Sequence, residues 1–366
     1  MLFASQILKI ILAPFSLLYG LIIRFRNYLY DKKYLKSVRF DFPIIAIGNL
    51  TVGGTGKTPH TEYLLKLLGS NYKTTVLSRG YKRKSKGYHI ATETDDANML
   101  GDEPLLLKKK YPFTEVCVAE DRLFAIPQII NDLPETQVIL MDDAFQHRAV
   151  SPNLSILLTT YNNPYYNDML LPAGRLREYA SAAARADFIV VTKCPEDITA
   201  ATKQEIIKKI QPEKHQKVFF SFLHYGTPYN LMNPNERLPL HKNQDVYIFC
   251  GIANTDELES YVASKVNRSW LRQYSDHHYY DRYDLETISE SFNNIESNSK
   301  ILLTTEKDAA RLYEHREWFI QKKLSIFALP VEVRFFRQDQ QLFNQEILTY
   351  LYTVTNATHG KPDSEN

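Results

Sequence analysis

A glycine-rich segment at residues 47–59 has the residue types of a phosphate-binding loop. It reads IGNLTVGGTGKTP and lies between an apolar stretch and a stretch with the pattern of a helix start. Its glycines would let the backbone turn several N–H groups toward an anion. Lys57 would neutralise the β- and γ-phosphates of a nucleotide, and Thr58 would offer its hydroxyl to Mg²⁺. The expected nucleotide contacts are Thr51, Val52, Gly53, Gly54, Thr55, Gly56, Lys57 and Thr58.

The segment departs from the usual pattern at one position. That pattern is G-x-x-x-x-G-K-[ST], and Thr51 stands where the first glycine is expected. Gly56, Lys57 and Thr58 follow the pattern, and they carry the helix-terminus contact, the charge and the metal ligand. A purely structural corner between a strand and a helix would not need a lysine at this one position. The segment therefore predicts a nucleotide site.

A second acidic site for the metal follows an apolar run at residues 138–141. The sequence VILMDDAFQH places Asp142 and Asp143 at the expected carboxyl end of a strand. Carboxylates in this position hold Mg²⁺ directly or through water. The alternative is that the paired acids only make a turn, and the phosphate loop on the same chain favours the metal role. Which of the two aspartates contacts the metal directly stays open.

Short apolar runs that could position these residues recur along the chain. Their nearly continuous apolar character is typical of parallel strands buried on both faces. Because helix-like segments separate them, the pattern predicts an α/β fold with a doubly wound, mainly parallel sheet. The expected strands are 43–49, 73–80, 115–120, 137–144, 154–160 and 187–194.

A turn-rich stretch at residues 217–240 interrupts this alternation and predicts a hairpin or a connector between domains. A second, smaller alternation follows, with apolar runs at 244–254, 300–313 and 324–335 and a helix from Asp256 to about Asn267. The expected units are an N-terminal hydrophobic and basic membrane-associated helix (1–40), a phosphate-loop core (41–215), a two-stranded connector or hinge (216–242), a smaller C-terminal α/β domain (243–354) and a polar, frayed tail (355–366).

The composition supports a globular protein of two domains. The 366 residues are 44% apolar and 23% charged. A net charge of only +2 does not suggest a nucleic-acid partner. Cys117, Cys194 and Cys250 lie far apart, which predicts reduced thiols with no disulfide framework or zinc site.

The N-terminal segment differs from the rest of the chain. An apolar run from Ala4 to Ile23 is interrupted by Lys9 and Pro14, and a group of lysines and arginines follows it. The order of charge and apolar residues is not that of a secretory signal, and the interruptions argue against a full transmembrane span. We expect an anchor in the membrane interface whose basic residues meet anionic headgroups. The alternative is a helix packed on the soluble core.

A phosphate loop alone is compatible with an ATPase, a kinase or a GTPase. The GTPase specificity motif N-K-x-D is absent, since VVTKCPED at residues 190–197 lacks the asparagine. Nine short motifs occur in order across residues 48–312, and together they resemble the tetraacyldisaccharide 4'-kinase family of inner-membrane lipid A biosynthesis kinases. The motifs are GNLTVGGTGKTP, SRGY, GDEP, DDAFQHR, LPAGRLRE, VTK, GIAN, SDHH and TEKDAARL.

The resemblance implies transfer of the γ-phosphate of ATP to the 4'-hydroxyl of a tetraacylated glucosamine disaccharide 1-phosphate, which forms lipid IVA. It further implies Mg²⁺, a location on the cytoplasmic face of the bacterial inner membrane and no obligate protein partner. Thr51 is the usual residue of the family, whereas Ala144 replaces an expected glycine. A membrane-associated switch or chaperone with ATPase or GTPase activity is the alternative, and it would turn over nucleotide without an acceptor. A non-enzymatic scaffold would not need Lys57, Thr58 or the acidic pair.

The resemblance also implies site residues on both sides of the connector. Asp102 of GDEP is the expected base, paired with His277 of SDHH, although sequence does not separate His277 firmly from His278. Taken alone, Asp102 could equally be a helix N-cap. Closure of the second domain over ATP would bring the pair together.

Further roles follow from the same resemblance. Arg177 is expected to stabilise the transferring phosphate, a task that Arg175 could share, and Glu178 is expected near the metal. Arg79, Tyr81 and Glu103 are the expected substrate contacts, and Lys307 is a possible nucleotide contact.

Overall fold

A nine-stranded sheet carries the phosphate loop in the computed structural model, which describes residues 2–359. All strands from β8 to β4 in the order across the sheet pair in parallel, whereas β14 and β3 pair antiparallel at the two edges. The doubly wound, mainly parallel α/β fold is therefore confirmed. In order across the sheet, the strands are β14 (Val331–Phe335), β8 (Lys217–Tyr225), β7 (Phe188–Thr192), β6 (Leu154–Thr160), β1 (Ile44–Asn49), β5 (Val138–Met141), β2 (Thr74–Ser78), β4 (Glu115–Val118) and β3 (His89–Ile90).

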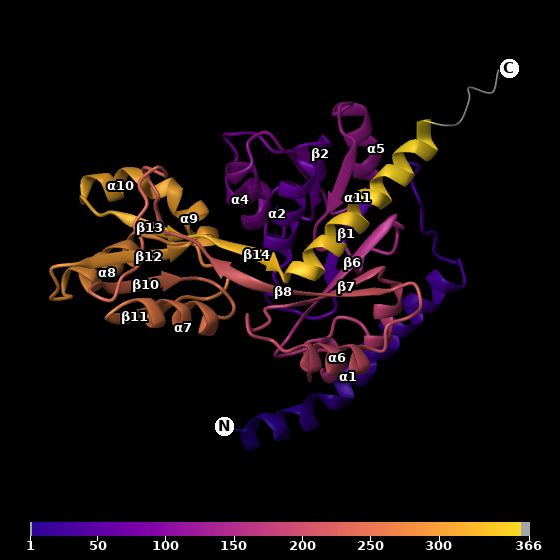
Figure 1. Ribbon diagram of the computed structural model, residues 1–366, viewed down its shortest axis with the longest axis horizontal. Coiled ribbons are helices and arrows are strands. Elements are labelled where there is room, and N and C mark those ends of the chain that lie inside the picture. Colours follow the sequence, from indigo (N-terminus) through magenta and orange to yellow (C-terminus); the bar gives the residue numbers. More distant parts are fainter. Residues whose placement is uncertain (1, 360–366) are drawn as a thin grey trace.

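Helices cover both faces of this sheet (Figure 1). Successive residues of β1 point to opposite faces. Ile45 and Ile47 therefore pack with the helices of one layer, and Ile44 and Ala46 join the core on the other. The first layer contains α2 (Lys57–Leu68), α4 (Asp102–Lys110) and α11 (Arg337–His359), and the opposite face is covered by α5 (Arg122–Asp132), α6 (Ala200–Ile210) and α1 (Leu2–Asp31). A short helix, α3 (Ala97–Leu100), precedes α4.

A second sheet of five strands lies at the other end of the molecule (Figure 1). In order, its strands are β11 (Arg268–Gln273), β10 (Asp245–Cys250), β12 (Lys300–Thr305), β13 (Ile326–Leu329) and β9 (Tyr229–Asn230). Its helices are α7 (Asp256–Lys265), α8 (Arg282–Asn293), α9 (Glu306–Leu312) and α10 (Arg316–Gln321). The described part of the chain also has three short 3-10 helices, at Tyr165–Asn167, Ala180–Arg185 and Tyr313–His315.

The chain passes between the two sheets at places that the sequence patterns did not predict. The apolar run at 324–335 is not one strand, because Pro330 separates β13 from β14 and the two belong to different sheets. Of the two alternatives for 217–240, the hairpin is wrong, since β8 pairs with β7 and β14, whereas β9 pairs with β13. The segment instead runs from one sheet to the other, as a connector does. The chain from residue 331 thus returns to the first sheet. Helix α11 continues to His359, into the segment expected to be a frayed tail, and residues 360–366 lie outside the described residues.

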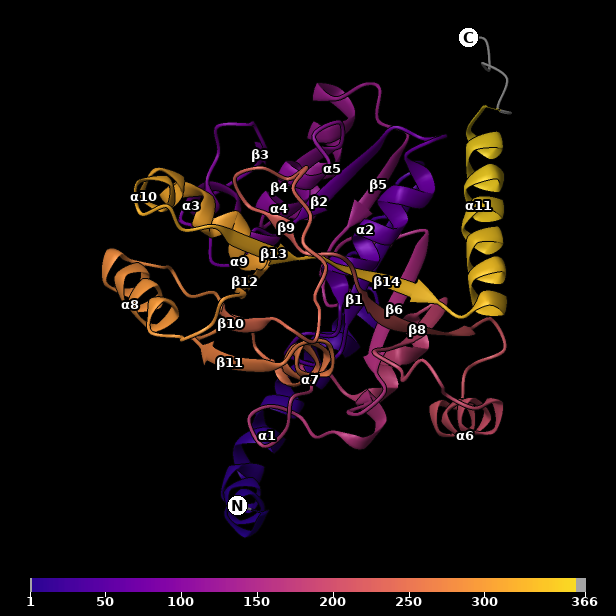
Figure 2. The same cartoon turned by 60° about the vertical axis from the view of Figure 1, so that its left-hand side comes forward.

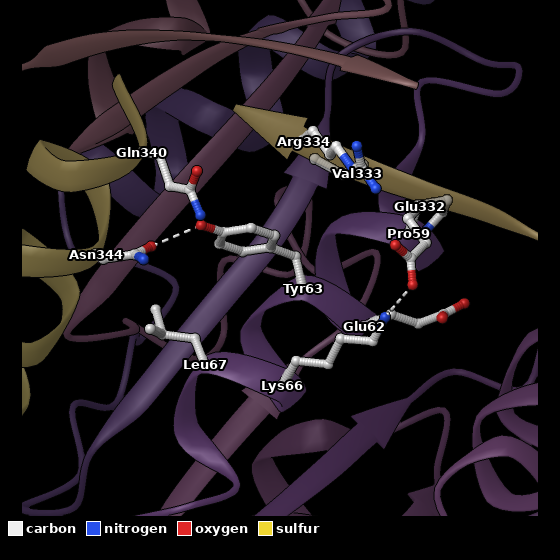
Figure 3. Close-up of a pocket in the computed structure, with 10 residues that line it drawn as sticks. All are labelled: Pro59, Glu62, Tyr63, Lys66, Leu67, Glu332, Val333, Arg334, Gln340 and Asn344. Carbon is white, nitrogen blue, oxygen red and sulfur yellow. Dashed lines mark hydrogen bonds and ion pairs between the residues drawn. The ribbon is translucent and has the colours of Figure 1, made fainter. Parts of the chain in front are cut away.

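Aromatic packing holds α11 against the larger sheet. Phe343 stacks on Phe335 with 4.5 Å between ring centroids, and it meets Phe219 edge-on at 5.1 Å. Nearby, Tyr63 of α2 donates a 2.7 Å hydrogen bond to Asn344 of α11. Figure 3 shows this tyrosine between Asn344 and Gln340, at a pocket of about 330 Å³ between α2, β14 and α11. None of the expected site residues lines this pocket.

The phosphate loop is held in shape by left-handed glycines and a buried histidine. Gly53 and Gly56 have φ of 107° and 86°, values that residues with a Cβ rarely adopt. His60 Nδ1 lies 2.7 Å from the Gly56 carbonyl, which must accept, so Nε2 is left to accept from the Ser221 hydroxyl at 3.0 Å. Burial lowers the pKa of His60 to about 4, although the Gly56 hydrogen bond opposes the shift. The imidazole is thus neutral in the folded protein at neutral pH.

Helix α1 has two faces of different character. Leu18, Leu21, Ile22 and Phe25 are at least 60% exposed and lie on one side at helical spacing. On the other side Ser16 donates to the Leu170 carbonyl, and a Cβ on Gly20 would come within 2.3 Å of the Tyr179 hydroxyl. Leu8–Asp31 is long and apolar enough to cross a membrane, by length and composition only. The amino-terminal part of α1 projects beyond the rest of the chain (Figures 1 and 2).

The three cysteines and Ala144 also had predicted environments. Cys117, Cys194 and Cys250 are buried free thiols, as predicted. Ala144 is not among the described residues with positive φ, so its backbone does not require the expected glycine.

Replacing Phe343 by alanine should destabilise the protein by about 3–5 kcal/mol, because a buried aromatic side chain is lost and a cavity remains. The measurement is urea unfolding followed by circular dichroism. Phe113→Ala is the matched control, since Phe113 is 98% exposed, and it should change stability by less than about 0.5 kcal/mol. Equal midpoints for both variants would contradict the assigned role of α11.

Lowering the pH from about 6.5 to 4 should destabilise the fold through His60. Its pKa is lowered in the folded state, so the unfolded chain binds the extra proton and stability rises with pH across this window. The difference amounts to up to about 3 kcal/mol. The unfolding free energy of His60→Asn should depend less on pH in the same range. Parallel curves for the two proteins would disprove the prediction.

Candidate active site

The expected phosphate and metal residues meet at one edge of the larger sheet. β1 and β5 are parallel neighbours, so Asn49 and the acids that follow Met141 lie at the same carboxyl end. Lys57, the first residue of α2, places its ammonium 3.5 Å from Asp143 Oδ1 and 3.4 Å from Asn49 Oδ1. The lysine, the loop and the acidic pair therefore lie together at this edge of the sheet.

The two aspartates have different environments. Burial and the neighbouring Asp143 charge raise the pKa of Asp142 to about 6, and Thr61 donates a 3.3 Å hydrogen bond to it. Burial also acts on Asp143, but Lys57 and Arg177 outweigh it and hold its pKa below the usual value. Asp143 is thus firmly ionised and already paired, whereas Asp142 is a buried carboxylate that would gain from a further cation.

Arg177 lies where the sequence places it, against the phosphate loop. Its guanidinium donates to both oxygens of Asp143, at 3.1 and 3.3 Å, and to Asn49 Oδ1. The backbone explains this position, because Arg177 N–H donates to the Leu50 carbonyl at 2.7 Å and Val52 N–H donates to the Arg175 carbonyl at 2.8 Å. The Arg175 side chain instead pairs with Asp168 at 2.8 Å.

Glu178 does not face the acidic pair directly. It is fully buried, and its Oε2 accepts from Arg185 at 2.9 Å and from Asn27 of α1 at 3.1 Å. Its Oε1 is buried and has no hydrogen-bond partner among residues 2–359. An unpaired buried carboxylate oxygen is costly, so this atom can still accept a ligand such as a cation or water.

The residues present fit Mg²⁺, which prefers oxygen ligands and commonly binds one or two carboxylates together with substrate phosphates. Thr58, Asp142 and Asp143 supply such oxygens beside the loop. The raised pKa of Asp142 and the unpartnered Glu178 Oε1 both show anionic groups that protein cations do not fully compensate.

Asp102 is the first residue of α4, and its side chain does not cap that helix. The N-cap is Gly101, with no side-chain capping bond, so the capping alternative is wrong. Instead Asp102 Oδ2 accepts from His277 Nδ1 at 2.5 Å and from Arg311 Nη2 at 2.7 Å. Burial opposes ionisation, but these two bonds outweigh it and hold the pKa of Asp102 well below its usual range.

The structure separates the two adjacent histidines. His277 pairs with Asp102, whereas His278 bonds to Asp284 at 2.7 Å and stacks on Tyr274. His277 has a φ of 63°, in the left-handed region. The pairing of Asp102 with His277 rather than His278 is thus seen directly.

Lys307 lies beside this pair and not at the phosphate loop. Its ammonium is 2.9 Å from Glu103 Oε1 and 3.4 Å from His277 Nε2. Asp102, Glu103 and His277 bring one ligand atom each within 4.8 Å of one another. Lys307 and Arg311 already supply positive charge to these acids, so we assign no metal to the cluster.

The remaining expected substrate contacts surround the same place. The Tyr81 ring is exposed and lies 5.5 Å from the His277 ring. Arg79 is exposed just after β2, which neighbours β5 in the sheet. The Glu103 charge also raises the pKa of Asp142, after burial and Asp143. Because β2 and β5 are parallel neighbours, the segment after β2 that carries Arg79 and Tyr81 lies at the same edge of the sheet as Asp142 and Asp143. Through Tyr81 and its His277 contact, the two clusters share this edge.

Two residues of this region were not identified from the sequence. Asn49 ends β1 and contacts both Lys57 and Arg177, and Arg311 contacts Asp102 from the second sheet's helix α9. Both lie within the motifs GNLTVGGTGKTP and TEKDAARL, so the motifs contained the signal. Only the folded chain shows which side chains in them turn toward the site.

Comparison with known proteins agrees with this geometry. Residues 8–352 match the family model described as tetraacyldisaccharide-1-P 4'-kinase. The chain is 41% identical over 351 residues to the tetraacyldisaccharide 4'-kinase of Bacteroides thetaiotaomicron, covering 93% of this chain and 92% of that protein. It is 40% identical to the one from Flavobacterium johnsoniae, covering 94% and 98%.

A solved structure has the same fold. It is LpxK from Aquifex aeolicus, determined in complex with ATP, and it is 32% identical with a TM-score of 0.71. The match covers 95% of this chain and 99% of the other. The family suggested by the nine sequence motifs is thereby confirmed: this chain belongs to the tetraacyldisaccharide-1-P 4'-kinase family.

Proposed function

We propose that this protein transfers the γ-phosphate of ATP to the 4'-hydroxyl of a tetraacylated glucosamine disaccharide 1-phosphate and so forms lipid IVA. The observation that carries the proposal is the pairing of two sites in one region. A phosphate loop with Lys57 and two acids accounts for the donor, and a buried Asp102–His277 pair accounts for activation of an acceptor. A simple nucleotide switch has no need of the second site.

On the donor side, the loop N–H groups and Lys57 would bind the β- and γ-phosphates. Thr58, Asp142 and Asp143 would hold Mg²⁺, which neutralises charge that develops on the phosphates. Glu178 would act from further away, through its unpartnered Oε1. Arg177 is already oriented by Asp143 and Asn49, and its guanidinium would stabilise the spread charge of the transferring group.

On the acceptor side, Asp102 would take the proton of the sugar hydroxyl, because such a hydroxyl is a weak nucleophile until a base accepts its proton. His277 would orient Asp102 through its hydrogen bond to Oδ2 and would help to compensate the negative charge of the carboxylate. Since Asp102 belongs to the unit of the first sheet and His277 to that of the second, we propose that both units form the site. Arg79, Tyr81 and Glu103 would contact the substrate at its rim.

The exposed face of α1 supports a location at the cytoplasmic surface of the inner membrane. Its apolar side chains would enter the acyl region, and the lysines and arginines that follow would meet anionic headgroups. The other face of the same helix bonds to the site, since Tyr19 donates to the Arg177 carbonyl at 2.8 Å. The anchor would thus hold the phosphate loop close to an acylated substrate.

The proposed reaction is tested with labelled ATP, Mg²⁺ and tetraacyldisaccharide 1-phosphate, followed by separation of the labelled lipid. Lys57→Ala should abolish labelling. Asp102→Asn keeps the side-chain shape but cannot take a proton, so kcat should fall by about 10²–10⁴-fold while ATP still binds. Asp256→Asn, an exposed acid in the first turn of α7, is the control and should be fully active. No labelled lipid from the unmodified protein would refute the proposed reaction, and full activity of Asp102→Asn would refute only the base.

The membrane proposal is tested by sedimentation with vesicles that contain an anionic lipid. Changing Leu18, Leu21, Ile22 and Phe25 together to serine should weaken vesicle binding by about 10²-fold or more, because each apolar side chain contributes about 1.5–3 kcal/mol when buried. Ile320→Ser is the matched control, since Ile320 is equally exposed but lies on α10. Unchanged binding of the quadruple variant would exclude α1 as the anchor.

A further inference from the structure

Asp102 has a second charged partner that the proposed reaction does not explain. Arg311 lies on α9 and donates from Nη2 to Asp102 Oδ2 at 2.7 Å. Its side chain is only 4% exposed. Arginine stays protonated and has no acceptor atom, so it cannot take a proton from a hydroxyl. Any effect of Arg311 on the reaction therefore acts through Asp102.

The guanidinium of Arg311 is itself held in one orientation. Its Nη1 donates to Asp308 Oδ1 at 2.9 Å and to the His278 carbonyl at 3.3 Å. Asp308 is fully buried, and Oδ1 also accepts from the Tyr280 hydroxyl at 3.0 Å and from Gly251 N–H at 3.1 Å. An arginine fixed at one end by such an acid presents its other end in a defined direction.

The two donors to Asp102 converge on the same oxygen. His277 and Arg311 both donate to Oδ2. Neither of these two side chains bonds to Oδ1. Because a planar carboxylate held at one oxygen by two fixed donors has little freedom to rotate, the direction of Oδ1 is set as well. Such an orienting contact affects the reaction rate, because a catalytic group that is misplaced by about 1 Å can lower the rate by about 10²-fold.

We infer that Arg311 is a positioning residue that fixes Asp102 with Oδ1 toward the acceptor hydroxyl. The inference rests on the proposed function of Asp102 as the base. In the step, the hydroxyl proton passes to Asp102 Oδ1 and the hydroxyl oxygen bonds to the γ-phosphorus. The bond from the γ-phosphorus to the β–γ bridging oxygen breaks, and ADP leaves.

The test compares Arg311→Gln with the unmodified protein in the lipid-labelling assay. The variant should lose about 10²-fold in kcat, and KM for ATP should stay within about twofold, because Arg311 does not contact the phosphate loop. Arg316→Gln, an exposed arginine on the neighbouring helix α10, is the control and should keep full activity. An unchanged kcat in Arg311→Gln would overturn the inference.

A double-mutant cycle with Asp102→Asn separates positioning from a general structural role. If Arg311 acts only through Asp102, the double variant Asp102→Asn/Arg311→Gln should be no slower than Asp102→Asn alone. An equal fold loss in both backgrounds would overturn the inference and leave the proposed function intact. Full activity of Asp102→Asn alone would instead remove the base on which the inference rests.

Arg311→Gln removes the positive charge that compensates both Asp308 and Asp102, so this variant can fail to fold. Arg311→Lys keeps a positive charge beside both acids but cannot bond to them as a rigid fork. It should fold, measured as a cooperative thermal transition, and lose about tenfold in kcat with KM for ATP unchanged. A folded Arg311→Lys variant whose kcat equals that of the unmodified protein would overturn the inference.

Discussion

The central constraint in this structure is the buried negative charge of Asp102. A carboxylate out of water is stable only when cations or hydrogen-bond donors replace its hydration. Asp102 begins α4, between β3 and β4 of the larger sheet in chain order, yet His277 and Arg311, which compensate it, both come from the unit of the smaller sheet. Charge compensation therefore requires the two units to dock. The same contact that stabilises the docked arrangement assembles the acceptor side of the proposed reaction.

Neighbouring charges extend this contact between α4 and α9. Lys110 of α4 lies 2.7 Å from Glu62 of α2 and 2.7 Å from Glu306 at the start of α9. Burial raises the pKa of Glu62, although Lys110 opposes the shift. Lys307 continues the row with its pair to Glu103. The helix that follows the phosphate loop is thus linked through α4 to the second sheet, which connects the donor and acceptor sides.

The donor side depends on the geometry of parallel strands. Because β1 and β5 end at the same edge, Asn49 and Asp143 meet there, and Lys57 and Arg177 lie between them. The segment that carries Arg177 runs beside the loop, and α1 packs behind it through Tyr19 and Asn27. The helix proposed to meet the membrane therefore bonds directly to the segment that carries Arg177.

Much of this could be predicted from the sequence, for physical reasons that act locally. Apolar runs buried on both faces define parallel strands, a glycine-rich turn before Lys57 defines an anion site, and ordered motifs identify the family. Contacts between distant segments were less predictable. The apolar run at 324–335 gave no sign that its halves pair with different sheets, and Lys307 lies beside Glu103 because α9 packs on α4. The sequence determined which chemical groups are present and on which local elements they stand. Only the tertiary structure decided which groups share a site, because buried charges such as Asp102 and Arg311, 209 residues apart in the chain, pair only when their elements pack together.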